Sequence, residues 1–284
     1  MSLLVGSDSP PLALELKERP TQDNEEPLVY WQEKTKSGLG EFTTVRLDLH
    51  SDLYALNLFI NPPGPRAPDS ANSRLELPIT IAQVGKFLVG VNATSYTLPD
   101  KTPAATESWK TFIPGTNVTL RGFAKARDHE PIGDGPAAPS YPTLWQRKNG
   151  EIGLTTGPYP TDASWAFSAF HWLIKDGQPY RAILPYIERT SRTSAGISKD
   201  GRWFYLAVCG PSGDDSTEKQ GASLPEMANH LISLNVDRAL NFDGGSSTAM
   251  VIKKQDAYSL TPPPEKIISR PIPFMFGITG STDG

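Results

Sequence analysis

Proline and glycine interrupt this chain at short intervals, and they limit what it can fold into more than any other feature. Its 284 residues include 27 prolines and 24 glycines. Proline lacks the amide hydrogen that a helix interior needs, and glycine is found mostly in turns. Prolines are frequent between about residues 97 and 164, which excludes long helices there. We therefore expect many short strands joined by turns and loops.

Composition excludes several classes of protein. A net charge of −4 argues against a nucleic-acid partner, since a phosphate backbone selects a basic face. No stretch reaches the ~18 uncharged apolar residues of a membrane helix, and the first residues show no signal peptide. Cys209 is the only cysteine, so neither an internal disulfide nor a cysteine zinc site is expected. The four histidines lack ligand spacing, so no metal site is predicted, and the oligomeric state is left open.

The chain is divided into two parts by its patterning. Residues 1–38 are predicted to be a loose N-terminal extension, because the start is polar, acidic and without a sustained period. Residues 39–284 are predicted to form one domain. A capping box at Ser223-Leu224-Pro225-Glu226 predicts a helix, and a shorter helix is expected at 77–84. Alternating runs predict strands at 42–49, 53–60, 86–91, 170–175, 192–198, 202–208, 236–242, 249–252 and 272–279. These elements predict an α/β fold, more specifically a strand-rich α+β domain with a mixed β-sheet and long proline-rich loops.

The segment Asn241-Phe242-Asp243-Gly244-Gly245-Ser246-Ser247-Thr248 is the strongest candidate for chemistry. A carboxylate follows a strand, two glycines allow close backbone approach, and three hydroxyl residues add hydrogen-bond donors. Successive amides in such a turn can form an anion site. The alternative is a plain hairpin turn, because Asp-Gly between apolar runs is common there.

Other candidates are weaker when taken singly. Arg192, at the start of a strand, can grip a phosphate or carboxylate with two parallel hydrogen bonds, although a solvated arginine is the simpler interpretation. Asn92, at the end of a buried strand, can orient a sugar hydroxyl or cap a turn. Neither a serine-hydrolase elbow nor a phosphate loop is present in the sequence.

Taken together, these segments resemble the phosphodiester glycosidase domain family, which includes the catalytic domain of the mannose 6-phosphate uncovering enzyme and bacterial exopolysaccharide-associated proteins. The specific part of the resemblance runs from Arg192-Thr193-Ser194-Ala195-Gly196 to Asp243-Gly244-Gly245-Ser246-Ser247. Val91-Asn92-Ala93 and Arg270-Pro271 extend it more loosely. Two positions depart from the family pattern. Cys209 stands where the family usually has Asp, with Asp214 or Asp215 as candidate substitutes, and Ser246 stands where a third glycine is frequent.

The resemblance implies a hydrolase that cleaves a sugar-1-phosphodiester and releases free sugar and a phosphomonoester. It implies Asp243 and Arg192 as catalytic residues, no organic cofactor, and a location outside the cytoplasm; a divalent cation is left open. The residues implied in substrate binding are Asn92, Thr193, Gly244, Gly245, Ser246, Ser247, Thr248 and Arg270. Two alternatives stay open: a non-catalytic module that binds glycans or sugar phosphates, motivated by Cys209, and an unrelated enzyme acting on another phosphorylated metabolite.

Overall fold

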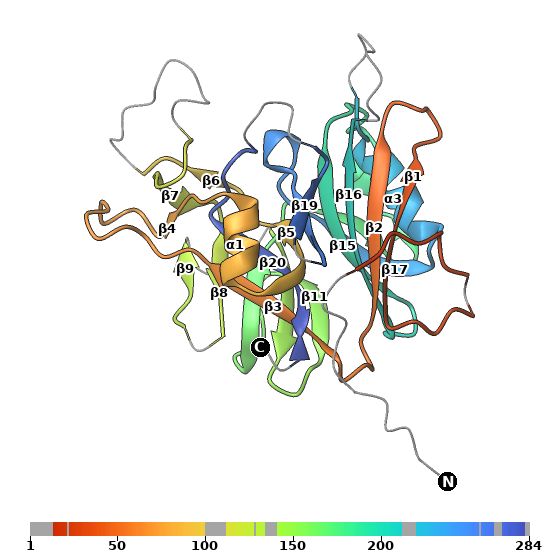
Figure 1. The fold of residues 1–284 in the computed structure, drawn as a ribbon, viewed down its shortest axis with the longest axis horizontal. Helices are drawn as coiled ribbons and strands as arrows, with labels where there is room; N and C mark the ends of the chain where they lie inside the picture. The colour runs from red at the N-terminus through yellow and green to blue at the C-terminus, as the bar shows by residue number, and fades with distance from the viewer. Residues whose placement is uncertain are drawn as a thin grey trace.

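The fold is built mainly from antiparallel β-sheets. The computed structural model describes residues 14–21, 23–99, 112–127, 129–133, 141–211, 220–255, 257–263 and 269–281. This part of the chain contains four sheets and two α-helices, α1 (Pro78–Val84) and α3 (Leu224–Ile232) (Figure 1). It is therefore mostly β. The strand-rich composition with few helices expected from the sequence is confirmed, whereas the balanced α/β class and the mixed sheet are not, because the paired strands are antiparallel. Hairpins such as 192–210 explain the difference, because tight turns can join only antiparallel strands.

The largest sheet has seven strands in the order β1-β2-β16-β15-β17-β13-β14. The helix α3 packs on one of its faces, where Met227, Ala228 and Leu231 are buried against Ala207 and Ala239. The predicted capping box begins this helix: Ser223 accepts from the Glu226 amide, and Glu226 accepts from the Ser223 amide. The strands are β1 (Leu28–Lys34), β2 (Glu41–Asp48), β13 (His171–Lys175), β14 (Gln178–Pro179), β15 (Arg192–Ser198), β16 (Trp203–Gly210) and β17 (Val236–Asn241).

Three further sheets complete the described structure. The first has the order β19-β18-β5-β20-β3, the second β11-β10-β12-β8-β9, and the third β4-β7-β6. The strands of the first are β3 (Tyr54–Ile60), β5 (Phe87–Asn92), β18 (Met250–Lys254), β19 (Ala257–Thr261) and β20 (Phe274–Gly280). Those of the second are β8 (Phe123–Lys125), β9 (Ile132–Gly133), β10 (Pro142–Arg147), β11 (Ile152–Thr156) and β12 (Ala163–Ser168). Those of the third are β4 (Ser73–Arg74), β6 (Tyr96–Thr97) and β7 (Asn117–Leu120). Two short 3-10 turns are η1 (Arg181–Ile183) and η2 (Gly245–Ser247).

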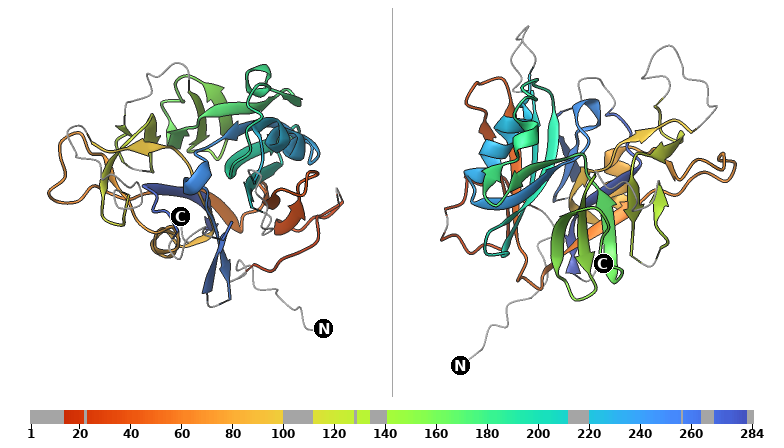
Figure 2. Two further views of the ribbon diagram at one scale, coloured as in Figure 1. Left: turned by 90° about the horizontal axis from the view of Figure 1, so that it is seen from above. Right: turned by 180° about the vertical axis from the view of Figure 1, so that it is seen from behind.

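The main core lies between the sheets. Phe276 of β20 packs against Phe167 and Trp165 of β12, with ring centroids 5.0 Å apart in both pairs, and against Phe204 of β16 at 6.0 Å. Strands from three sheets thus share one apolar interior. The seven-stranded sheet with α3 lies at one end of the molecule, and the small three-stranded sheet lies at the other (Figures 1 and 2).

The beginning of the described chain is more ordered than its polar composition suggests. Residues 28–34 form β1, which pairs with β2 along its whole length. Leu14 is buried and its amide donates to the Lys253 carbonyl at 3.0 Å. The boundary expected after residue 38 therefore falls inside the β1–β2 hairpin, while the division into an extension and one domain remains a prediction. In the described part of the chain, no helix is long and apolar enough to cross a membrane.

Candidate active site

Three strand ends meet at the candidate site, and Asn92 joins them. Asn92 is the last residue of β5, and its side chain is buried. Its Oδ1 accepts from the Thr193 hydroxyl at 2.7 Å and from the Ala249 amide at 3.0 Å. Its Nδ2 donates to the backbone carbonyl of Asp243 at 2.8 Å. One amide side chain therefore fixes β5, β15 and the segment after β17 relative to one another.

Asp243 follows β17 at the point where the strand leaves the sheet. The backbone amide of Asp243 donates to the Ala93 carbonyl at 2.8 Å, which holds it beside the end of β5. Its carboxylate accepts from the Gly244 amide at 3.0 Å and from the Ser247 hydroxyl. Because three hydrogen bonds hold this residue in place, its carboxylate has a fixed direction.

The electrostatic surroundings of Asp243 are mixed. Protein atoms crowd around the carboxyl group, and this burial raises its pKa above the usual value for aspartate. The bonds from Ser247 and Gly244, and the positive charges of Arg270 and Arg121, act in the opposite direction. The net effect is a carboxyl group with a raised pKa within electrostatic range of two arginines, as expected of a group with a chemical role.

Arg270 is held beside this carboxylate by aromatic residues. Its Nε donates to the Tyr96 hydroxyl at 3.0 Å, and its guanidinium lies 4.5 Å from the centre of the Phe112 ring. The Tyr96 hydroxyl in turn donates to the Pro271 carbonyl at 2.8 Å and is also bonded to Ser247. Ser247 therefore lies between the carboxylate and the tyrosine. Tyr96, Phe112 and Arg121 were not predicted as site residues, since each lies in an irregular or proline-rich stretch without a recognisable motif.

The turn after Asp243 uses much of its own hydrogen-bonding capacity. Gly245 has a φ of +60°, which favours glycine, and begins the 3-10 turn η2. The Gly244 amide binds the Asp243 carboxylate, and the Gly245 amide donates to the Ser191 carbonyl at 2.7 Å. Two of the three amides of the expected anion site, those of Gly244 and Gly245, are therefore already used in hydrogen bonds within the protein. Among the described residues, no partner accepts from the amide of the third residue, the exposed Ser246.

The family of this chain follows from a comparison with known proteins. A family model described as phosphodiester glycosidase matches residues 116–279, more than half of the chain. The chain belongs to the phosphodiester glycosidase family. No curated protein matches the sequence.

Solved structures share the fold of this phosphodiester glycosidase family member. One is the catalytic domain of zebrafish N-acetylglucosamine-1-phosphodiester alpha-N-acetylglucosaminidase, auto-inhibited by its pro-peptide; the alignment has 18% identity and a TM-score of 0.61 and covers 90% of this chain and 85% of that one. Another is a candidate exported protein from Burkholderia pseudomallei K96243, with 14% identity, a TM-score of 0.51 and coverage of 84% and 74%. At these identities, the likeness concerns the fold.

Arg192, the second residue that the family resemblance assigned to catalysis, lies on the other face of the sheet from Thr193. Adjacent strand residues point to opposite faces, and Arg192 pairs across the sheet with Cys209. Its Nε donates to the Ala222 carbonyl at 3.1 Å and one terminal nitrogen to the Glu188 carbonyl at 2.9 Å. The Arg192 Cδ would lie 3.8 Å from a Cβ atom placed on Gly244. Arg192 therefore lies against the backbone of the turn at Gly244 and does not act on the Asp243 carboxylate. The arginines whose charges lower the pKa of Asp243 are Arg270 and Arg121.

Cys209, where the family resemblance implies an aspartate, lies in the interior of the protein. Cys209 is fully buried on the face that packs against α3, and burial raises the pKa of its thiol. Across the strand pair from this neutral thiol, Arg192 donates to backbone carbonyls. Asp214 and Asp215, the candidate substitutes, lie outside the described residues.

The remaining hydroxyls occupy different environments. Ser247 touches Asp243, whereas Thr248 is buried and its Oγ1 has no hydrogen-bond partner within the described structure. Across the described ranges, no group of three or more His, Cys, Asp or Glu side chains lies close enough to hold a metal ion. Among the described groups, the site thus offers one carboxylate, two arginines, a tyrosine and a serine as its chemical groups.

Proposed function

We propose that this protein hydrolyses glycosyl phosphodiesters. The bond that breaks joins the anomeric carbon to a phosphate oxygen, and the bond that forms joins the same carbon to a water oxygen. One water proton passes to a base and the other stays on the sugar, so the products are a free sugar and a phosphomonoester. The observation that carries this proposal is the fixed Asp243 carboxylate, held by Gly244 and Ser247, within electrostatic range of Arg270 and Arg121.

The two arginines suit the phosphodiester half of such a substrate. A phosphodiester carries one negative charge, and a guanidinium can donate two parallel hydrogen bonds to it. Arg270 has little freedom because Tyr96 binds its Nε and Phe112 supports its guanidinium plane. A preorganised cation of this kind stabilises the charge that gathers on the departing phosphate without reorganisation during the reaction.

Asp243 suits the sugar half. A phosphate is a good leaving group, so the reaction needs stabilisation of positive charge at the anomeric carbon more than protonation of the leaving oxygen. The ionised Asp243 supplies a negative charge there, as nucleophile or as base towards water. Ser247 and the exposed Ser246 would orient sugar or phosphate oxygens, whereas the hydroxyl of Thr248 is buried and faces no substrate. Asn92 and Thr193 act as positioning residues, since Asn92 donates to the backbone carbonyl of Asp243 and Thr193 donates to Asn92.

The test measures which bond is broken. The protein is incubated with the methyl phosphodiesters of glucose and of N-acetylglucosamine, both anomers of each, in water labelled with heavy oxygen. Cleavage at the anomeric carbon places the label in the free sugar, as we expect. Label in the phosphate would mean attack at phosphorus and would overturn the proposal.

A matched pair of variants assigns the role of the carboxylate. Asp243→Asn keeps an oxygen for the Gly244 amide, so it should fold, and we expect turnover to fall at least about 100-fold. Asp162→Asn changes an exposed aspartate that pairs with Arg147, and should retain full turnover. Full turnover in Asp243→Asn would contradict the assignment.

The non-catalytic alternative makes the opposite prediction. The specific observation in its favour is Cys209, which puts a buried neutral thiol beside Arg192 where the family resemblance implies a carboxylate. A binding module would be stabilised against heat by the same diesters without releasing sugar. Sustained turnover by the unmodified protein eliminates this alternative.

The location outside the cytoplasm also stays a proposal. It is supported by the description of the Burkholderia structural neighbour as a candidate exported protein and by the family resemblance. Fractionation of the source cells, followed by detection of this chain, is the direct measurement.

A further inference from the structure

Exposed apolar side chains gather beside the candidate active site. Six large apolar side chains are exposed in the described part of the chain, and four of them lie in two short segments: Ile113 in the first, and Leu184, Tyr186 and Ile187 in the second. Ile187 is 77% exposed, the most of the six. These four side chains, together with the neighbouring Phe112, are called the apolar rim below. Apolar side chains that meet water side by side usually mark a place where a ligand binds.

The second segment, residues 184–187, leads directly into the turn that follows Asp243. The Ser191 carbonyl, four residues further along the chain, accepts from the Gly245 amide at 2.7 Å. The Thr190 hydroxyl oxygen would lie 3.8 Å from a Cβ atom placed on Gly245. Four residues of chain span at most about 14 Å. The exposed side chains of this segment therefore lie at the edge of the candidate site.

An aromatic ring continues this segment towards the sheet. The centre of the Tyr186 ring lies 5.4 Å from that of His171, the first residue of β13. His171 pairs across the sheet with Asn241, two residues before Asp243. Burial, and to a smaller extent the charge of Arg192, lower the pKa of His171, so its ring is neutral near pH 7. The ring beside Tyr186 therefore adds aromatic surface without adding a charge.

The first segment borders the site on the side of its arginines. Phe112 lies 4.5 Å from the guanidinium of Arg270, and the next residue, Ile113, is half exposed. Figure 1 shows β7, which follows this segment, and β15, which follows the other, on opposite sides of β5. In the proposed reaction Arg270 binds the phosphate. The alcohol oxygen on the same phosphorus atom therefore comes close to Phe112 and Ile113.

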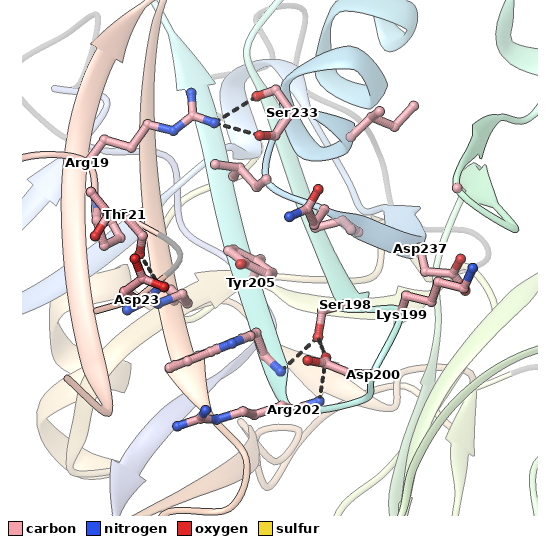
Figure 3. A pocket seen from close by; sticks show the side chains of 18 of the residues that line it. Arg19, Thr21, Asp23, Ser198, Lys199, Asp200, Arg202, Tyr205, Ser233 and Asp237 are labelled. Carbon is pink, nitrogen blue, oxygen red and sulfur yellow. Dashed lines mark hydrogen bonds between the residues drawn. The ribbon is translucent and has the colours of Figure 1, made fainter. Parts of the chain in front are cut away.

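The far end of the seven-stranded sheet has a different character. Figure 3 shows a cavity there whose polar side chains bond to their own neighbours: Arg19 donates to the Ser233 carbonyl, and Asp200 accepts from the Ser198 hydroxyl. None of the six exposed apolar side chains of the described residues lines this cavity. Exposed apolar surface is therefore a feature of the candidate active site and not of every hollow in this protein.

We propose that the alcohol part of the phosphodiester substrate is an apolar chain, aliphatic or aryl, which lies on the apolar rim. This inference deepens the proposed hydrolysis and rests on it, because the chain belongs to the same substrate. Of the two groups that the phosphate joins, the sugar is covered with hydroxyls, so the extended apolar group is the alcohol. Each methylene group that leaves water for the rim contributes to affinity. After cleavage, the phosphomonoester carries the chain.

The test compares 1-phosphodiesters that differ only in their alcohol: methanol, octanol, and a second glucose joined through its 6-hydroxyl. Both anomers of glucose and of N-acetylglucosamine carry each alcohol. Binding to the Asp243→Asn variant is measured by calorimetry, because turnover is expected to fall in this variant. We expect an octyl diester to bind at least about 10-fold more tightly than the matching methyl diester, the factor from burial of two methylene groups. Equal binding of octyl and methyl diesters, no binding of either, or tighter binding of the glucose diester would overturn the proposal.

Matched substitutions locate the bound chain. Ile113→Ser and Ile187→Ser each replace an exposed apolar side chain, so both variants should fold. We expect at least one of them to reduce the octyl-to-methyl affinity ratio about three-fold or more, and both to bind the methyl diester as before. The control is Val84→Ser, which changes an exposed residue at the end of α1, at the opposite end of β5 from Asn92. An unchanged ratio in both rim variants, or an equal loss in Val84→Ser, contradicts the assignment.

Turnover and vesicle binding separate this inference from two others. If the unmodified protein releases no sugar but the octyl diester binds through the rim, the hydrolysis proposal fails and the rim remains a site for an apolar phosphodiester. If sugar is released and the octyl and methyl diesters bind equally, hydrolysis stands and the rim assignment fails. Sedimentation with phosphatidylcholine vesicles that is lost in Ile187→Ser, without any preference for the octyl diester, would assign the rim to a membrane surface and overturn the proposal.

Discussion

The Thr193 hydroxyl donates a 2.7 Å hydrogen bond to the Asn92 side chain across the boundary between two sheets. Thr193 belongs to the seven-stranded sheet and Asn92 to the five-stranded sheet that contains β18 and β20. Both residues are buried. The Asn92 side chain also donates a hydrogen bond to the backbone carbonyl of Asp243. The geometry of the candidate site and the packing of the two sheets therefore depend on the same contact.

Substitution of Asn92 should destabilise the fold more than substitution of Thr193. Asn92→Ala leaves the Ala249 amide, the Thr193 hydroxyl and the Asp243 carbonyl without their partner, so we expect the free energy of unfolding to fall by about 3 kcal/mol. Thr193→Val should cost about 1 kcal/mol, because Asn92 keeps its bond to Ala249. Urea denaturation measures both. The exposed Lys254→Ala is the control, at below about 0.5 kcal/mol. Equal losses in the two buried variants would contradict this account.

The pH dependence of turnover should report the raised pKa of Asp243. If the ionised carboxylate acts, kcat/KM rises with pH through a midpoint above 3.8, the ordinary aspartate value. Arg270→Gln removes a charge that lowers this pKa, so its midpoint should move to higher pH, measured as a pH–rate profile. Arg147→Gln, at an exposed ion pair, should leave the midpoint in place. A midpoint that moves to lower pH in Arg270→Gln would refute the electrostatic effect of Arg270 on Asp243.

The same raised pKa has a consequence for stability. The folded state holds the Asp243 proton to higher pH than the unfolded chain does, so this group's contribution to stability is present at low pH and is lost as pH rises through the folded pKa. Asp243→Asn abolishes that loss. The unfolding free energy of the variant, relative to the unmodified protein, should therefore increase between pH ~4 and neutrality. A flat difference across this range would show that burial does not perturb the carboxyl group.

The two glycines after Asp243 should respond differently to alanine. Gly245→Ala meets open space, with the nearest atom 3.8 Å away, and should cost only the ~1 kcal/mol of a residue with φ of +60°. In Gly244→Ala the new Cβ would lie 2.8 Å from the Ser191 carbonyl oxygen. Since that oxygen belongs to the backbone, the turn must shift, and we expect about 2 kcal/mol and a larger loss of turnover. Thermal unfolding and turnover of the two variants test this difference. A larger loss in Gly245→Ala than in Gly244→Ala would contradict the geometry described.

Cys209 should be chemically inert in the folded protein. The thiol is fully buried and its pKa is raised, and the thiolate is the reactive form. At pH 8, an aromatic disulfide reagent should label the native protein roughly 100-fold or more slowly than a small thiol. Protein unfolded in urea, which exposes the same cysteine, is the control and should react fully. Rapid labelling of the native protein would contradict the burial.

Much of the local structure could be predicted from the sequence. Alternation of apolar and polar residues identified β2, β15 and β16, an apolar run closed by prolines identified β3, and Ser223 with Glu226 identified the start of α3. Local patterns succeed there because strand alternation and capping depend on neighbours within a few residues. Strand β1 was not predicted, and it is held in the structure by pairing with β2.

For the site, the sequence by itself singled out the Asp243-to-Thr248 turn, because a carboxylate, two glycines and hydroxyls in a row form a local pattern, whereas Asn92 was ambiguous alone and entered through the family resemblance. Only the tertiary structure decided which arginines meet that carboxylate. Arg270 and Arg121 come from irregular segments and Tyr96 from the short strand β6, and packing brings these distant parts of the chain together, while strand alternation turns Arg192 to the opposite sheet face. Charge–charge contacts between remote segments leave no short-range signature, so folding alone brings them together.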